Sequence, residues 1–149
     1  MPRLLIFAPC EKAIIDQNNV TSLITILQEL RLELPEPPPD ADGKMPVVPI
    51  KWDVVALWAK TDDDAPEAIY QTRFALIDPM GTALQGFDGA VEFSFADKEH
   101  YRVVTTVFGF PIRHDGGYVV RLWLQKKGET EGDPIAEFPI VLRRTRPKD

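Results

Sequence analysis

The chain has 149 residues, of which 44% are hydrophobic and 27% are charged, and its formal net charge is -6. We expect residues 1–149 to form a single domain, because this length suits one hydrophobic core. The balance of hydrophobic and charged residues excludes a disordered chain, and the negative charge argues against nucleic acid or an anionic membrane as a partner. The 14 prolines disfavour long helices and favour short elements joined by turns.

Cysteine content and hydropathy predict where the protein acts. The single cysteine, Cys10, cannot form an internal disulfide, which is typical of a reducing compartment. The apolar run from Leu4 to Ala8 is shorter than the core of a secretion signal, and no run is long enough for a membrane-spanning helix. We therefore expect a cytoplasmic protein that does not act in a membrane.

The first third of the chain predicts strands separated by a tight turn. Residues 3–9 are a short apolar run bounded by prolines, which favours a strand, and the polar residues 16–19 favour a chain reversal. Residues 22–34 fit two patterns, a helical apolar stripe and an alternation rich in β-branched residues. The strand is the better fit, with a bulge near Gln28 joining its two halves.

Residues 35–49 are predicted to form a long proline-rich loop. Its start, Pro35 to Pro39, favours an extended polyproline segment. The proline spacing also fits a ligand of proline-recognising domains, although the acidic flanks favour a rigid crossover between two sheets. Residues 52–59 carry large apolar side chains on both alternations, which indicates a central strand covered on both sides.

The rest of the chain predicts a series of strands with turn signals between them. The decisive pattern is the alternation of Tyr118, Val120, Leu122 and Leu124, with Arg121 and Gln125 on the opposite face, which places one face of a strand in a core. Strands are expected at residues 69–77, 90–95, 101–110, 116–125 and 135–142, and residues 144–149 are expected to form a flexible basic tail. The prediction is an all-β protein, an antiparallel β-sandwich of about 7–9 strands.

Two segments resemble a bacterial family of proteins of unknown function. Residues 8–27 contain a strand, a turn after Asp16 and the segment Ser22-Leu23-Ile24, and residues 116–118 and 138–142 supply a closing Gly-Gly-Tyr strand and a final apolar strand. The chain is similar over most of its length to this family of short immunoglobulin-like β-sandwich proteins, except that Thr25 replaces a common glycine. The resemblance implies an immunoglobulin-like sandwich, with no assigned activity and no site residues.

Two alternatives to a simple binding protein involve reactive or acidic side chains. Cys10 with His100 or His114 is the nucleophile and base set that the sequence offers, so a small hydrolase or transferase using Cys10 is one alternative. Glu11 beside the thiol would raise its pKa and oppose this role. The acidic loop at residues 62–67 could bind calcium, which is the second alternative. Consecutive acidic residues point in divergent directions, however, so we predict no catalytic residues, metal or cofactor.

Aromatic residues predict an interaction surface. Trp123 lies on the strand face opposite the expected core, and one of Trp52, Trp58 or Leu57 must also lie on an outer face. If these side chains meet, the surface around Trp123, Arg121 and Trp58 would suit a protein partner or a second copy of the chain. The alternative is that a loop, such as the proline-rich segment, lies over the rings and stacks on them. The sequence therefore favours a non-enzymatic binding or assembly module.

Overall fold

The computed structural model describes residues 1–33 and 45–145, and these residues form nine strands and no helix. The all-β prediction is confirmed. None of the described residues belongs to a helix that could span a membrane. The strands are β1 (Arg3–Ile15), β2 (Thr21–Ile26), β3 (Glu29–Glu33), β4 (Val47–Ala59), β5 (Tyr70–Ile77), β6 (Gly89–Phe93), β7 (His100–Pro111), β8 (Gly116–Lys126) and β9 (Ala136–Thr145).

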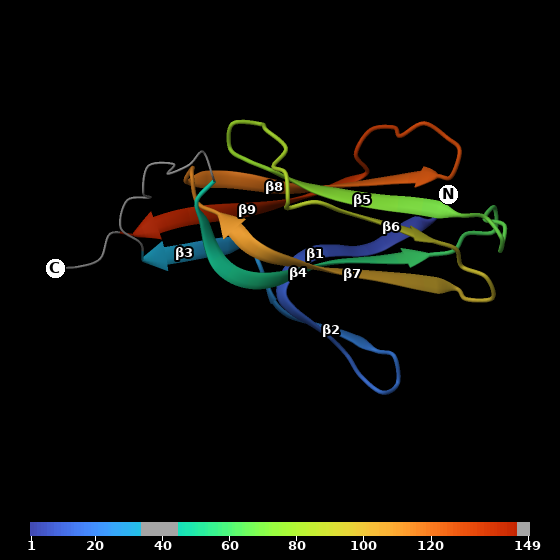
Figure 1. The fold of residues 1–149 in the computed structure, drawn as a ribbon. Helices are drawn as coiled ribbons and strands as arrows, with labels where there is room; N and C mark the ends of the chain where they lie inside the picture. Colours follow the sequence, from blue (N-terminus) through green and yellow to red (C-terminus); the bar gives the residue numbers. More distant parts are fainter. Residues whose placement is uncertain (34–44, 146–149) are drawn as a thin grey trace.

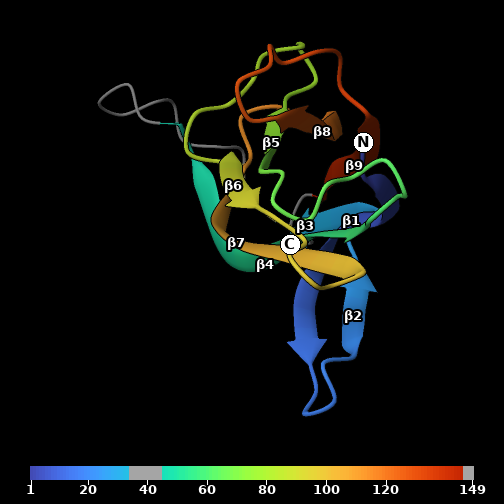
Figure 2. The same cartoon turned by 90° about the vertical axis from the view of Figure 1, so that its right-hand side faces the viewer.

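The strands form two sheets that lie against each other as layers (Figure 1). One sheet has the order β2-β1-β4-β7, and all its neighbours are antiparallel. The other has the order β3-β9-β8-β5-β6, in which only β3 and β9 run parallel. Figure 2 shows β4 and β7 in the layer opposite β5 and β8.

The core lies between the two sheets. Trp52, Val54 and Trp58 alternate along β4 and belong to the core. On β8, the alternating side chains of Tyr118, Val120, Leu122 and Leu124 also belong to it. Tyr118 and Val120 are 1% and 0% exposed, which confirms the alternation predicted for this strand. Burial of these large side chains supplies the main stabilising free energy of the sandwich.

Residues 22–34 are extended, as predicted, but they form two strands in different sheets. Leu27 and Gln28 separate β2 from β3, and the buried Leu27 donates its N–H to the carbonyl oxygen of Pro9 over 2.9 Å. The carbonyl oxygen of Gln28 accepts the N–H of Val141, also over 2.9 Å. The chain therefore crosses from one sheet to the other near Gln28, where the sequence predicted a bulge within one strand.

Two predicted boundaries need correction. β4 begins at Val47, so the end of the proline-rich loop predicted at residues 35–49 belongs to a strand. Pro49 is tolerated there because the register shifts between Val48 and Lys51, and irregular pairing does not need its missing N–H. The polyproline prediction at residues 35–39 lies outside the described residues.

The second boundary is the predicted tail at residues 144–149. β9 continues to Thr145, and Arg144 pairs with Leu32 of β3. The Arg144 guanidinium donates to the carbonyl oxygen of Ile112 and lies 3.3 Å from the Asp115 carboxylate. Arg144 is therefore part of the sheet, and residues 146–149 lie outside the described residues.

The β1–β2 hairpin extends away from the two layers (Figures 1 and 2). β1 changes partner along its length, because residues 3–10 pair with β4 and residues 10–15 pair with β2. The predicted turn at residues 16–19 joins the hairpin, with the Asp16 carboxylate accepting the N–H groups of Asn18 and Val20. The four-stranded sheet is consequently curled like half of a barrel, with β2 and β7 at its two edges.

Candidate functional site

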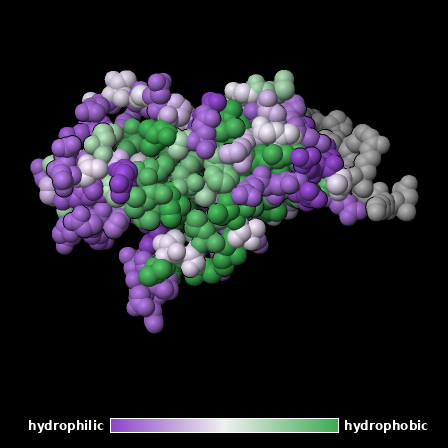
Figure 3. Space-filling model, turned by 180° about the vertical axis from the view of Figure 1, so that it is seen from behind, coloured by the Kyte–Doolittle hydropathy of each residue, from purple (hydrophilic) through white to green (hydrophobic). Residues whose placement is uncertain are grey.

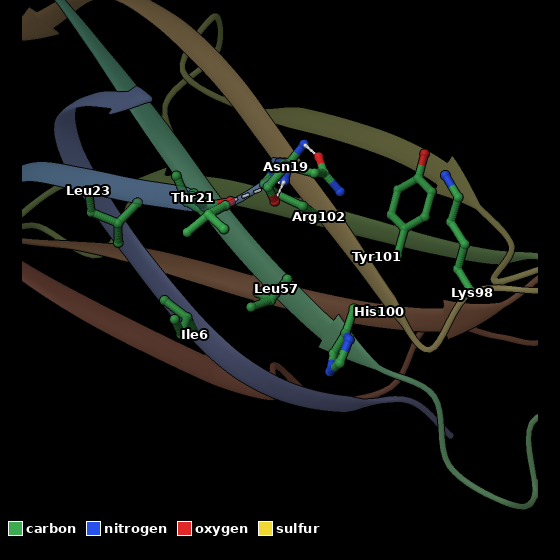
Figure 4. A pocket seen from close by; sticks show the side chains of 11 residues that line it. Ile6, Asn19, Thr21, Leu23, Leu57, Lys98, His100, Tyr101 and Arg102 are labelled. Carbon is green, nitrogen blue, oxygen red and sulfur yellow. Dashed lines mark hydrogen bonds between the residues drawn. The ribbon is translucent and has the colours of Figure 1, made fainter. Parts of the chain in front are cut away.

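A groove of about 620 Å³ lies on the face of the four-stranded sheet that points away from the core. The curl of the sheet makes this face concave. This volume is within the range of about 300–1,000 Å³ that is typical of small-molecule sites. Figure 4 shows side chains from β1, β2, β4 and β7 around the groove. We call it the sheet groove, and its lining residues are Ile6, Asn19, Val20, Thr21, Leu23, Val55, Leu57, Lys98, His100, Tyr101 and Arg102.

The floor of the sheet groove is aliphatic. Trp52, Val54 and Trp58 of β4 face the core, so Val55 and Leu57 between them face outward. Val55 is nevertheless 1% exposed, whereas Ile6, the cross-strand partner of Leu57, is 45% exposed. The groove floor therefore combines a covered apolar part with an accessible one.

The hairpin forms one wall of the groove and is fixed to the sheet by a buried carboxylate. Asp53, only 7% exposed, accepts the backbone N–H of Ala13 over 2.9 Å and the hydroxyl of Thr106 over 2.7 Å. A buried carboxylate needs such donors because its desolvation is costly. These bonds join β1, β4 and β7 beside the groove.

The opposite wall is cationic and is supplied by β7 and the residues before it. Arg102 reaches across to the hairpin, where it donates to the Asn19 carbonyl and side-chain oxygens over 3.3 Å and 2.9 Å and to the Thr21 hydroxyl over 3.1 Å (Figure 4). All three acceptors are uncharged. Within residues 1–33 and 45–145, Arg102, Lys98 and His100 form no ion pair with a carboxylate.

Apolar side chains are also exposed outside the groove. Leu5, Ile24 and Ile26 on β1 and β2 are 39%, 42% and 44% exposed. Seen from behind, hydrophobic residues gather over the middle of the molecule and continue to the base of the hairpin (Figure 3). The β1–β2 region thus carries accessible apolar surface on a protein whose net charge is -6.

The surface predicted around Trp123, Arg121 and Trp58 does not exist as one patch. Trp58 is 0% exposed and belongs to the core, so it contributes no side chain to the surface. The outward-facing residue of that region is Leu57, which lies on the sheet opposite the one that carries Trp123. The prediction that Trp58 meets Trp123 on an outer face is therefore wrong.

Trp123 and Arg121 themselves lie on the outer face of the five-stranded sheet. The Arg73 guanidinium stacks 3.8 Å from the centre of the Trp123 ring, and Arg73 also pairs with Glu131 over 2.7 Å. Arg121 pairs with Glu137 over 2.7 Å. These contacts occupy both side chains within the chain, and their role in partner binding stays a prediction.

The structure separates Cys10 from both histidines. Cys10 and His100 pair with Asp53 and Ala59 of β4, six residues apart, which corresponds to roughly 20 Å along a strand. His114 follows β7 beyond Pro111, past the other end of that pairing. Cys10 and these histidines therefore form no nucleophile and base pair.

Native Cys10 should react slowly with thiol reagents. Cys10 is 0% exposed, and burial, followed by the negative charge of Asp53, raises the pKa of its thiol to about 11. The thiolate is the reactive form, so we expect labelling by iodoacetamide at pH 8 to require opening of the structure and to accelerate greatly in urea. Mass spectrometry over time checks this result, and rapid native labelling would contradict it.

The acidic loop at residues 62–67 uses its buried carboxylate internally. Asp64 is 4% exposed and accepts the Thr61 N–H and hydroxyl over 2.8 Å each, as well as the Tyr70 hydroxyl over 2.7 Å. No group of three or more histidine, cysteine or acidic side chains that could hold a metal ion occurs in the part of the chain that the structure describes. Calcium binding by this loop is therefore unsupported.

Sequence reasoning missed the sheet groove as a site. Large apolar residues on both faces of β4 did indicate that its outer face is covered, and Val55 and Leu57 lie on that face. Nothing local indicated that the hairpin would cover it, because Arg102 and its acceptor Thr21 are 81 positions apart.

No family model matches the chain, and no curated protein matches it either. The resemblance to a family of immunoglobulin-like proteins therefore stays a prediction.

Proposed function

We propose that this chain is a non-enzymatic binding module with an immunoglobulin-like fold, and that the sheet groove binds the apolar part of an anionic ligand. The observation that carries the proposal is the combination of an aliphatic floor with two cations, Arg102 and Lys98, that have no carboxylate partner within the described residues. Apolar pockets with a few convergent polar groups are the usual form of ligand sites. Cations at such a pocket that have no carboxylate partner favour a negatively charged ligand.

Two features support an immunoglobulin-like topology. The first strand of the five-stranded sheet, β3, runs parallel to the last strand of the chain, β9. Tyr118 near the start of β8 donates its hydroxyl to the carbonyl oxygen of His114 over 2.7 Å. A tyrosine that bonds a backbone carbonyl a few residues upstream, at the start of the next-to-last strand, is characteristic of immunoglobulin-like sandwiches.

Function belongs to the site and not to the fold. A cytoplasmic binding module with a protein partner, or with a second copy of itself, remains compatible with the proposal. The groove makes the proposal more specific, because its position, its apolar floor and its cationic wall define where a ligand binds and which kind of ligand fits.

The proposal predicts saturable binding of an anionic apolar dye. We expect 8-anilinonaphthalene-1-sulfonate to bind the folded protein with one site per chain, and Leu57→Glu to weaken binding about tenfold or more, since it places a carboxylate in the apolar floor. Met80→Glu is the matched control, because Met80 is 73% exposed and is not among the groove residues. Dye fluorescence titration measures the affinities.

Near-ultraviolet circular dichroism must show that both variants keep native packing, since loosely packed states also bind this dye. Equal dye affinity in the wild type and in Leu57→Glu would contradict the proposal, and so would the absence of saturable binding.

A further inference from the structure

We infer that the ligand of the sheet groove is a linear aliphatic carboxylate of the fatty-acid type, with its alkyl chain on the floor and its carboxylate at Arg102. The inference rests on the proposed function and names the ligand class for the same groove. Three properties of the site support it: the aliphatic side chains of the floor, the fully paired backbone beneath the floor, and the hydrogen-bond donors on the cationic wall.

The floor favours an alkyl chain because its side chains are aliphatic. Ile6, Leu23, Val55 and Leu57 come from three strands and line the same groove. Tyr101 is the single phenylalanine, tyrosine or tryptophan among the lining residues, and it lies beside Lys98 in Figure 4, away from the floor. A flexible hydrocarbon can follow such a surface and gains free energy with each methylene that leaves water.

The backbone beneath the floor disfavours a peptide as the occupant. β4 lies between β1 and β7, and both of its edges are paired along the stretch that carries Val55 and Leu57. A peptide lying there would bring amide groups onto a surface with no free backbone donors or acceptors, and unpaired amides are costly to bury. An alkyl chain has no such groups.

The cationic wall favours a carboxylate. Arg102 donates from Nη1 and Nη2 to uncharged oxygens, and its Nε makes no hydrogen bond within the described residues. A guanidinium has five N–H donors in a fork that matches a carboxylate. Lys98 lines the same side of the groove and adds to the positive field. The chain as a whole carries a charge of -6, so this wall is a local exception that selects an anionic head group.

Titration calorimetry with sodium octanoate, decanoate and dodecanoate, each below its micelle concentration, tests the inference. We expect binding of one molecule per chain, with an affinity that rises roughly twofold to fourfold for each added methylene. Arg102→Gln should weaken dodecanoate binding about tenfold, which is the usual effect of losing one charge-assisted contact. Lys51→Gln is the matched control, because Lys51 lies on the same sheet but pairs with Phe108, outside the groove.

A neutral probe separates the loss of charge from a movement of the hairpin, because Arg102 also contacts Asn19 and Thr21. Dodecanol should bind the wild type and Arg102→Gln equally. Weaker dodecanol binding to the variant would mean that the groove has changed shape and would overturn the assignment of the carboxylate to Arg102.

Further binding measurements also test the assignment of the ligand as a carboxylate. Equal or tighter binding of dodecyl phosphate or dodecyltrimethylammonium would overturn the carboxylate assignment, as would dodecanoate binding that Leu57→Glu leaves unchanged. If the dye binds as proposed and dodecanoate does not, the inference fails and the proposed function stands. If neither binds, both fail.

Discussion

Replacing Asp64 with alanine is expected to lower the free energy of unfolding by about 3 kcal/mol, because it removes the buried acceptor of three hydrogen bonds and the partner of the Met1 ammonium group, which lies 3.2 Å away. Asp64 is 4% exposed and accepts bonds from the N–H and hydroxyl of Thr61 and from the hydroxyl of Tyr70. Tyr70 is itself 2% exposed, so its hydroxyl would lose its partner in the core. Urea unfolding followed by tryptophan fluorescence measures the change.

Asp63→Ala is the matched control for this substitution. Asp63 is the exposed neighbour of Asp64, and its side chain makes no hydrogen bond or ion pair in the described part of the chain. We expect it to change the free energy of unfolding by less than about 0.5 kcal/mol. Equal effects of the two substitutions would show that the network around Asp64 does not contribute as described.

The same network gives the stability a definite dependence on pH. Burial alone would raise the pKa of Asp64, but the hydrogen bonds from the Thr61 backbone, Tyr70 and the Thr61 hydroxyl lower it from 3.8 to about 2. A carboxylate whose pKa is lower in the folded state stabilises the protein above its ordinary pKa, and this contribution is lost as the pH falls through the folded value. The difference in stability between the wild type and Asp64→Ala should therefore shrink between pH 4 and pH 2.

The sequence predicted the strands well because their signals are local. Tyr118, Val120 and Leu122 fall on alternate positions of one face, with Arg121 on the other, and a period of two can be read without knowledge of the fold. The ends of the strands were harder to predict, because Val47 and Arg144 belong to strands only through partners far away in the chain. Their assignment depended on contacts that no local pattern contains.

The split of residues 22–34 shows the same limit. The alternation on each side of Leu27 predicted extended chain, and both halves are strands. Whether they belong to one sheet or two depends on the bonds that Leu27 and Gln28 make with Pro9 and Val141. Those partners come from β1 and β9, so the sequence around Gln28 could indicate an irregularity but not a crossing.

The outward faces of the strands were the hardest part to predict. A β-sandwich strand with apolar residues on both alternations must be covered on both sides, and this argument correctly required an outer apolar residue near Trp52 and Trp58. It could not choose among Trp52, Trp58 and Leu57, because inward and outward registers differ by one residue. The prediction named Trp58, which lies in the core, and not Leu57, which lines the groove.

Removing the ring of Tyr118 is expected to lower the stability of the protein more than removing the Asp64 carboxylate. Tyr118 is 1% exposed, and its ring lies 5.1 Å from that of Phe110, edge to face. Tyr118→Ala should lower the free energy of unfolding by about 3–5 kcal/mol, the usual cost of deleting a buried aromatic side chain. Tyr118→Phe keeps the ring and should cost about 1–2 kcal/mol, since it removes the bond to the His114 carbonyl.

Tyr101→Phe is the matched control for the hydroxyl of Tyr118. Tyr101 is half-buried and stacks on Phe93 at 4.7 Å, but among residues 1–33 and 45–145 its hydroxyl has no hydrogen-bond partner. Its replacement by phenylalanine should change the free energy of unfolding by less than about 0.5 kcal/mol. Chemical denaturation of the three variants separates the ring from the hydroxyl. If Tyr118→Phe and Tyr101→Phe had the same effect, the Tyr118 to His114 bond would not fix the connection between β7 and β8, and the support that it gives to an immunoglobulin-like fold would be lost.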